Sequence, residues 1–278
     1  MHDNDERAAA MAVPALSGVP ETMLWTLHNR ASEALRPDGV LRDPDAVRIY
    51  HAIDYDYRRS FGDADGSHGL RSRVFDDALR PWLAAHPGAT VVELACGLET
   101  QFQRCDDGRV NWLCVDVPEA IALREHFLPA SARCRSLAMS ALDPRWMDAV
   151  DDSGGVFITV QGLLMYLDED EVRGLLRRIG ERFPSAELMF DAIPRWFSRK
   201  TLRGFYKTPA YRSPPMPWGI DRAEIESTLV RWLPRRTEVR LVPFGYLRGL
   251  AGVLLPIVSR IPGLRDFLPS IVRVTLQP

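Results

Sequence analysis

The middle of the chain alternates between short apolar runs and longer stretches with helical spacing. The predicted strands are Val91–Leu94, Trp112–Val115, Arg135–Ala138, Val156–Val160 and Glu187–Phe190, and the predicted helices between them include Pro118–Phe127 and Asp168–Phe183. In the second of these helices, Val172, Leu175, Leu176 and Ile179 recur at the spacing of one helical face. Strands that alternate with helices favour an α/β fold, with a mostly parallel sheet covered by helices on both faces.

Helical spacing also dominates the segment before the sheet. Three helices are predicted there, over Glu21–Leu35, Ala46–Tyr57 and Leu70–Ala85. Asp43 is the N-cap candidate of the second helix, with Pro44 at its first position. Residues 1–20 lack a clear pattern, so we expect a flexible arm there, followed by an N-terminal helical cap over residues 21–86.

The pattern changes again after the fifth predicted strand. Prolines and aromatic residues are frequent over residues 193–219, so we expect no long helix there. A helix over Arg222–Leu233 and two late strands, Val239–Phe244 and Ile271–Leu276, are predicted to follow. The most apolar run, Leu247–Ile261, is interrupted by charges and proline and is shorter than the roughly 20 apolar residues that span a bilayer. Its part Leu250–Val258 is either packed beneath the late strands or a contact for a partner or a membrane surface.

The composition is ordinary for a soluble globular protein. The chain has 278 residues, of which 46% are hydrophobic and 26% charged, and its net charge of -2 gives no basic excess for nucleic acid. The four cysteines form no Cys-x-x-Cys pair, so we expect thiols and no metal site. The acidic N-terminus does not resemble a signal peptide. We therefore expect a cytoplasmic monomer or homodimer without stable membrane insertion.

One strand ends in a glycine turn that can approach a ligand closely. The run Thr90–Thr100 reads as a strand followed by Ala-Cys-Gly, and Asp116 ends the next strand. Gly97 permits a sharp turn, and a carboxylate at Asp116 can accept hydrogen bonds from both hydroxyls of a ribose. Asp116 is equally suited to cap the helix that begins at Pro118. The turn lacks the Gly-x-Gly-x-x-Gly pattern that holds a pyrophosphate, which disfavours a nicotinamide-dependent dehydrogenase.

Several sequence blocks together resemble one family. The blocks are Arg71–Asp77, Val92–Phe102, Asp106–Val110, Val115–Glu119, Ser140–Asp143 and Gln161–Leu167. They resemble the leucine carboxyl methyltransferase and TcmP-like O-methyltransferase family, over roughly Glu21 to Trp218. The resemblance implies a Rossmann-like class I methyltransferase fold that uses S-adenosylmethionine. It also implies methyl transfer to a carboxylate or hydroxyl of a small molecule, such as a polyketide-like or other secondary metabolite. Residues 87–192 would form the cofactor-binding core, and residues 193–278 a substrate lid with strands that complete the sheet.

The resemblance also implies roles for individual residues. Arg71 would pair with the carboxylate of the cofactor's methionine part, and Asp116 would bind the ribose. Gln161 and Tyr166 would border the methionine end. The other cofactor-binding candidates lie on the same strands and turns, and they are Glu93, Ala95, Cys96, Gly97, Val117, Leu142 and Asp143.

Each candidate also has a structural interpretation. Glu93 lies within an apolar strand, where it needs partners whether it contacts a cofactor or forms a salt bridge. Arg71 also fits an exposed helix position, Asp143 a turn before proline, and Tyr166 a core position. An aromatic and basic cluster follows the fifth predicted strand. It either lines an acceptor pocket or packs against the sheet. The acceptor-binding candidates are Tyr166 and, from this cluster, Arg195, Trp196 and Tyr211.

Three positions depart from the family pattern. Ala95 stands where the family usually has Gly, Glu99-Thr100-Gln101 stands for Asp-x-Arg, and Gln161 stands for Glu. Gln161 keeps the shape of glutamate but not its charge, so weaker cofactor binding is expected. A degenerate member, which binds the cofactor structurally or catalyses a non-methylating reaction on a related metabolite, is the alternative function.

Methyl transfer from a sulfonium depends on alignment more than on acid–base chemistry. No histidine follows the carboxyl end of a predicted strand, so we nominate no catalytic residue. A carboxylate acceptor is ionised at pH 7, whereas a phenol with a pKa of about 10 benefits from a base. The lack of an obvious base therefore favours a carboxylate acceptor, or a substrate whose hydroxyl is already acidic.

Overall fold

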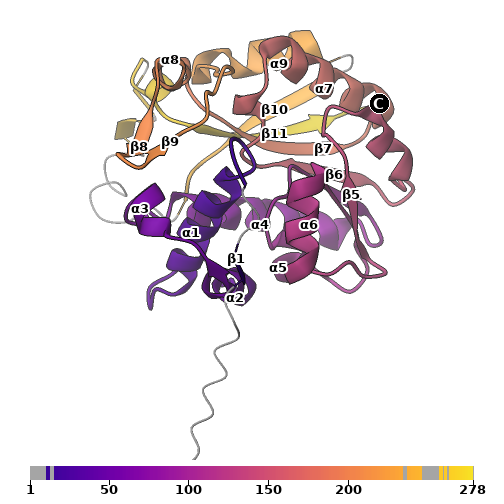
Figure 1. Ribbon diagram of the computed structural model, residues 1–278. Coiled ribbons are helices and arrows are strands. Elements are labelled where there is room, and N and C mark those ends of the chain that lie inside the picture. The colour runs from indigo at the N-terminus through magenta and orange to yellow at the C-terminus, as the bar shows by residue number, and fades with distance from the viewer. Residues whose placement is uncertain are drawn as a thin grey trace, which may run out of the picture.

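A seven-stranded sheet forms the centre of the protein, in the order β10-β11-β7-β6-β3-β4-β5 (Figure 1). The computed structural model describes residues 11–12, 16–233, 237–245, 257–258, 260–261 and 263–277. The strands are β3 (Thr90–Leu94), β4 (Asn111–Asp116), β5 (Cys134–Ala138), β6 (Val156–Val160), β7 (Glu187–Ala192), β10 (Thr237–Val242) and β11 (Ser270–Leu276). Neighbouring strands are parallel except for β11, which is antiparallel to both β7 and β10. The expected Rossmann-like sheet with late antiparallel strands is confirmed.

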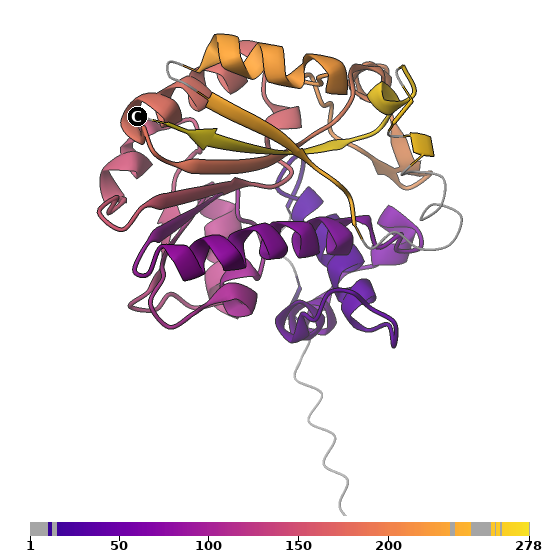
Figure 2. The ribbon, with the colours of Figure 1, turned by 180° about the vertical axis from the view of Figure 1, so that it is seen from behind.

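Helices cover both faces of the sheet. Successive residues of a strand point to opposite faces, so apolar residues of one strand contribute to two cores. In β3, Val92 and Leu94 belong to one core with α7 (Glu169–Arg182) and α9 (Ile225–Trp232). Val91 belongs to a second core with α4 (Ser67–Ala85), whose long course along the sheet is clear in Figure 2. Residues of α5 (Gln101–Cys105) and α6 (Pro118–Phe127) also belong to this second core.

Three further helices form a cap beside α6. They are α1 (Thr22–Ala34), α2 (Pro44–Ala52) and α3 (Tyr57–Phe61), and short strands β1 (Met11–Ala12) and β2 (Ile53–Asp54) pair in parallel beside them. Asp43 caps α2 as predicted, because its Oδ1 accepts from the Ala46 amide at 2.9 Å. The single helix predicted over Ala46–Tyr57 is wrong, since the backbone turns extended at Ile53 and ends α2. Of the predicted arm, residues 1–10 and 13–15 lie outside the described residues.

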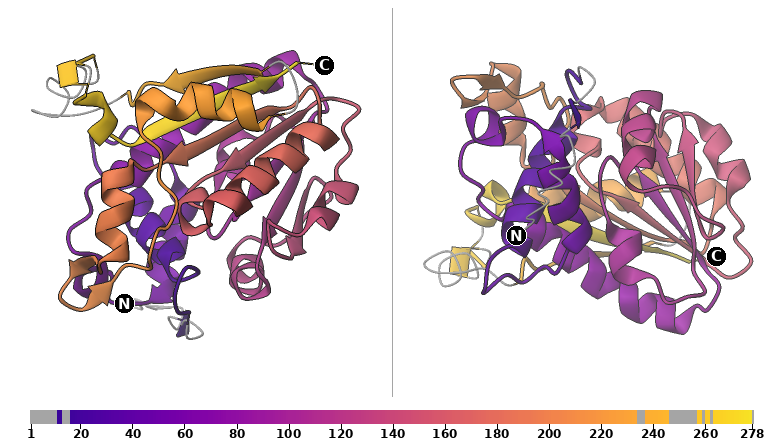
Figure 3. Two further views of the ribbon diagram at one scale, coloured as in Figure 1. Left: turned by 90° about the horizontal axis from the view of Figure 1, so that it is seen from above. Right: turned by 60° about the horizontal axis from the view of Figure 1, so that its bottom comes forward.

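The segment after β7 lies beside the cap, as Figure 3 shows for its hairpin. Thr208 donates to the carbonyl oxygens of Arg59 and Ser60 at 2.7 and 2.9 Å. The segment contains α8 (Arg195–Leu202), β8 (Tyr206–Thr208), β9 (Tyr211–Arg212) and η3 (Arg222–Glu224), and the other short helices are η1 (Pro144–Ala149), η2 (Leu164–Tyr166) and η4 (Arg265–Phe267). Most of the apolar run Leu250–Val258 lies outside the described residues. In the parts of the chain that the structure describes, no helix has the length and apolar content to cross a membrane.

Candidate functional site

A cavity of about 300 Å³ lies at the carboxyl ends of β3 and β4. The chain builds the sheet from β3 outward to β4 and β5, and then crosses to β6 on the other side of β3. Open α/β sheets bind ligands at such a reversal of strand order. The lining residues are Val19, Pro20, Thr22, Met23, Thr26, Arg71, Glu93, Leu94, Ala95, Cys96, Gly97, Leu98, Glu99, Asp116, Val117, Glu119, Gln161, Gly162 and Leu163.

The turn after β3 forms one wall of the cavity. Ala95 and Gly97 both adopt left-handed backbone conformations, with φ of 54° and 46°. At Gly97 a Cβ atom would lie 3.1 Å from the Cβ of Met23, so a larger residue would push against the cap. Arg124 of α6 donates to the carbonyl oxygens of Gly97 and Glu99 at 3.0 and 2.6 Å. The backbone of the turn is therefore fixed from both α1 and α6.

Ala95 is the residue of this turn whose conformation conflicts with its side chain. A left-handed backbone costs an L-residue about 1–2 kcal/mol, and glycine avoids this cost. We expect Ala95→Gly to raise the free energy of unfolding by about 0.5–1 kcal/mol, after the greater unfolded-state freedom of glycine is allowed for. Urea denaturation measures the change. The same substitution at Ala122, an exposed residue of α6, should destabilise by about 1 kcal/mol. A loss of stability at both positions would contradict a strained Ala95.

Asp116 presents its carboxylate to the cavity from the end of β4. Its Oδ2 accepts from the Gly97 amide and its Oδ1 from the Val117 amide, both at 2.8 Å. Burial raises the pKa of Asp116, although the two amides oppose this effect. Asp116 does not cap α6, because the N-cap of that helix is Val117 and no side chain caps it. The capping interpretation is therefore wrong, and the carboxylate is held in place by the turn that it faces.

Three buried polar atoms without partners belong to side chains that line the cavity. They are the Arg71 Nε, the Gln161 Oε1 and the Glu93 Oε1, and none has a hydrogen-bond partner within the described part of the chain. The Arg71 Nη1 donates to Asp191 at 2.9 Å, and the second Asp191 oxygen accepts from the Gly162 amide at 2.6 Å. The Arg71 Nε can donate to a carboxylate and the Gln161 Oε1 can accept from an ammonium, as the two charged groups of an amino acid require. The residues present therefore suit the methionine part of S-adenosylmethionine.

Burial favours the neutral form of Glu93 in this site. Burial raises its pKa well above the usual value, with Cys114 adding to the shift. Its Oε2 accepts from the Trp112 indole at 3.2 Å and lies 3.8 Å from the Cys114 sulfur. The sequence left open a salt bridge or a ligand contact, and the structure places Glu93 in the cavity wall with no salt bridge among the described residues.

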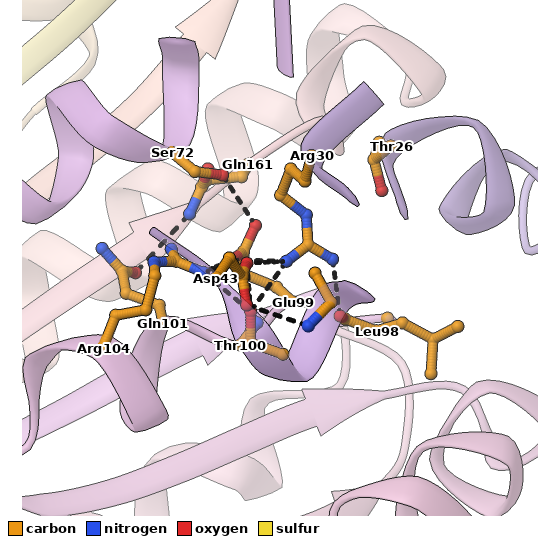
Figure 4. Close-up of polar contacts among 12 residues, drawn as sticks. Thr26, Arg30, Asp43, Ser72, Leu98, Glu99, Thr100, Gln101, Arg104 and Gln161 are labelled. Carbon is orange, nitrogen blue, oxygen red and sulfur yellow. Dashed lines mark hydrogen bonds and ion pairs between the residues drawn. The ribbon is translucent and has the colours of Figure 1, made fainter. Parts of the chain in front are cut away.

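A buried polar cluster supports the turn from behind (Figure 4). We call it the Arg30 cluster, and it consists of Arg30, Asp43, Ser72, Asp76, Glu99, Thr100, Gln101 and Arg104. Arg30 of α1 is fully buried and donates to Asp43, Glu99 and Thr100 at 2.9–3.2 Å, and to the Leu98 carbonyl at 2.6 Å. Arg104 of α5 lies 2.8 Å from both Asp43 and Glu99. The cap is thus bonded directly to the segment that follows the glycine turn.

Glu99 carries its charge in the middle of this cluster. Burial alone would raise its pKa, but Arg30 and Arg104 outweigh burial and hold the pKa of Glu99 well below its usual range. Ser72 donates to the second Glu99 oxygen at 3.0 Å. Buried charges are stable only when they are paired in this way, so the cluster depends on each of its members.

Most of the predicted cofactor residues line the cavity. These are Arg71, Glu93, Ala95, Cys96, Gly97, Asp116, Val117 and Gln161. The two others lie outside it. Leu142 packs at the edge of the core on the α7 face, and Asp143 accepts from the Arg145 amide at the start of η1 and pairs with the Arg145 side chain. Asp143 thus caps the short helix η1, in the structural role before Pro144 that the sequence also allowed.

The predicted acceptor residues do not line this cavity. Tyr166 follows Leu163 of the cavity wall, to whose carbonyl oxygen its amide donates at 2.9 Å, and burial raises the pKa of its phenol to about 12. Tyr211 is 5% exposed and packs edge-on against Phe61 of the cap. Arg195 pairs with Glu224. Trp196 is 42% exposed and borders a separate cavity of about 460 Å³, whose other lining residues are Arg199, Lys200, Arg203 and Gly204.

Two arginines that hold the site were not among the predicted residues. Arg30 and Arg124 are each at most 1% exposed, and both donate to the backbone after β3. Their positions carried a signal. Arg30 follows Leu27 by one helical turn, and Arg124 lies between Ile121 and Phe127, so both fall on apolar helix faces. A charged residue on such a face indicates a buried partner.

The chain is similar to known methyltransferases. The family profile of the leucine carboxyl methyltransferases matches residues 23–180. The tetracenomycin polyketide synthesis O-methyltransferase TcmP of Streptomyces glaucescens is 35% identical over 187 residues, which cover 66% of this chain and 69% of that protein. The S-adenosyl-L-methionine-dependent methyltransferase dpfgK of Gibberella zeae is 32% identical over 200 residues, which cover 64% of this chain and 67% of that protein. The crystal structure of N-methyltransferase NodS from Bradyrhizobium japonicum WM9 aligns with a TM-score of 0.46 and 14% identity, over 75% of this chain and 96% of that one.

Proposed function

The chain belongs to the leucine carboxyl methyltransferase family, and we propose that it transfers a methyl group to a carboxylate oxygen of a small molecule. The resemblance seen in the sequence is thereby confirmed, and S-adenosylmethionine is the methyl donor of this methyltransferase type. The cofactor supplies a methyl group on a sulfonium, which is already activated for transfer. The residues of this chain have to bind, orient and shield the reactants.

The family and the groups around the cavity carry the proposal. The family is named for carboxyl methylation. Tyr166 is a neutral phenol that can donate a hydrogen bond, because burial raises its pKa to about 12. Asp191 is already engaged by Arg71 and the Gly162 amide, and no histidine lines the cavity among the described residues. An ionised acceptor needs no base, and a carboxylate is ionised at pH 7 whereas a phenol with a pKa of about 10 is not.

The nature of the acceptor is supported by a relative. The Streptomyces glaucescens protein is named for polyketide synthesis, so we propose a secondary metabolite of that kind as the acceptor. Most of the family match lies in the cap and the cofactor core, which ends before α8. The segment that contains the predicted residues Arg195, Trp196 and Tyr211 lies outside the family match, so we propose it as the part that selects the acceptor.

Methyl-tritiated S-adenosylmethionine tests the proposal. The protein would be incubated with matched pairs of aromatic carboxylic acids and phenols. We expect labelled product from an acid, and mild alkali should release its label as volatile methanol, because methyl esters hydrolyse and methyl ethers do not. A base-stable labelled product would contradict carboxyl transfer. Binding of the cofactor without transfer to any acid or phenol would instead favour the degenerate alternative.

A further inference from the structure

Two glutamine side chains meet behind the cofactor cavity. Gln161 follows β6 and lines the cavity, whereas Gln101 begins α5 and is fully buried behind it. The Gln161 Nε2 donates to the Gln101 Oε1 at 3.5 Å, and the Gln101 Nε2 donates to the Asp76 Oδ1 at 3.2 Å. Figure 4 shows Gln101 between Arg104 and Gln161. The three side chains of Asp76, Gln101 and Gln161 form a row that ends at the cavity.

The direction of this row is set by Asp76. Asp76 is 1% exposed, and Arg104 donates to its two oxygens at 2.7 and 3.1 Å. A carboxylate paired in this way only accepts hydrogen bonds, so Gln101 must turn its NH₂ group toward Asp76 and its oxygen toward Gln161. Gln161 must then donate to Gln101. Its Oε1 is left as an acceptor with no partner among the described residues, in a side chain that lines the cavity.

We propose that Gln101 is a positioning residue, which orients the Gln161 amide so that its oxygen accepts a hydrogen bond from the ammonium of the cofactor. The inference rests on the placement of the methionine part beside Arg71 and Gln161. A reversed Gln161 amide would present its NH₂ to the ammonium, donor against donor. Asp76 prevents the reversal through Gln101, because a reversed row would set an oxygen of Gln101 against the carboxylate.

The row also predicts how Gln161→Glu behaves. A charged acceptor binds an ammonium more tightly than a neutral one. In this variant, however, the second carboxylate oxygen would face the Gln101 oxygen, and Gln101 cannot turn without opposing Asp76. Position 161 therefore suits a neutral amide, which explains why Gln161 occurs together with Gln101 in this chain.

Two ligands that share an adenosine part separate positioning from a general structural role. S-adenosylhomocysteine carries the ammonium, and 5′-methylthioadenosine lacks the whole amino acid. Titration calorimetry measures the affinity for each ligand. Gln161→Met should lower the affinity for S-adenosylhomocysteine about tenfold or more, and Gln101→Met should lower it about threefold to tenfold. Both variants should leave 5′-methylthioadenosine within about twofold. The double variant should bind S-adenosylhomocysteine no more weakly than Gln161→Met alone, because Gln101 acts through Gln161.

A matched control and two contrary results make the test decisive. Gln103→Met, at an exposed position of the same helix, should leave the affinities for both ligands unchanged. Equal losses for both ligands in Gln101→Met, or additive losses in the double variant, would overturn the proposal. Should Gln101→Met fail to fold, Gln101→Asn keeps the amide but shortens its reach, and it should show the same selective loss. Equal binding of both ligands by the unaltered protein would overturn the placement of the amino acid itself.

Discussion

Replacing Asp116 by asparagine should weaken the binding of S-adenosylmethionine by about 10- to 100-fold. The carboxylate is held by the Gly97 and Val117 amides and lines the cavity from the end of β4. A hydrogen bond to a charged group is worth about 1.5–3 kcal/mol and one between neutral groups about 1 kcal/mol, and a ribose offers two hydroxyls. The NH₂ group of the introduced asparagine would also oppose one of the two backbone amides. Titration calorimetry measures the loss of affinity.

The control for Asp116 is a carboxylate on the same side of the sheet that does not line the cavity. Glu125 is an exposed residue of α6, and Glu125→Gln should leave the affinity within about twofold. Thermal unfolding should show that Asp116→Asn remains folded at the temperature of the titration. An unchanged affinity in a folded Asp116→Asn protein would show that this carboxylate does not bind the ribose.

Replacing Arg30 by methionine should lower the free energy of unfolding by about 3–5 kcal/mol. The change removes one partner of a buried charge cluster and leaves Asp43 and Glu99 with Arg104 as their remaining cation in the Arg30 cluster. For a domain of this size, the loss corresponds to a fall in melting temperature of roughly 10 °C. The Leu98 carbonyl also loses its buried donor, so cofactor binding at the adjoining turn should weaken as well.

Arg58→Met is the matched control for Arg30. Arg58 also lies in the cap and pairs with Asp63, but its side chain is 77% exposed. Exposed ion pairs contribute about 0–1 kcal/mol, so this variant should melt close to the unaltered protein. Similar losses in the free energy of unfolding from both substitutions would contradict the stabilising role of the Arg30 cluster.

The same Arg30 variant should change the dependence of stability on pH. Because the folded pKa of Glu99 is held below its unfolded value, its contribution is fully present above a pH of about 4.3 and is lost as the pH falls through the folded pKa. Without Arg30 the folded pKa of Glu99 rises toward the usual value. Acid unfolding of Arg30→Met should therefore begin at a higher pH. Unfolding curves with the same acid midpoint would show that Arg30 does not stabilise the Glu99 charge.

The core of the fold was predictable from the sequence because its strands are short apolar runs with clear ends. The glycine turn closes β3 at Leu94, and Pro118 marks the start of α6. The cap was less predictable. Helical spacing continues past Ile53, but the chain turns extended there, and the aromatic residues that follow pack against α1. Tertiary packing, which single-residue spacing does not record, ends the helix.

The candidate site was also predictable only in part. The residues at the ends of β3, β4 and β6 come together in one cavity, because the carboxyl ends of parallel strands share an edge. The acceptor candidates Arg195, Trp196 and Tyr211 lie on a segment whose course depends on prolines and on packing against the cap, so their spacing in the sequence says little about their spacing in the fold. Arg30 and Arg124 act from helices that precede and follow the turn, and neither lies in one of the sequence blocks that resemble the family.

The most direct test of the account is a crystal structure with S-adenosylhomocysteine bound. We expect the ribose hydroxyls within hydrogen-bond distance of the Asp116 carboxylate, and the amino group within the same distance of the Gln161 Oε1. A ligand in another part of the molecule, or an Asp116 carboxylate that contacts only the Gly97 and Val117 amides while the ligand is present, would contradict the account.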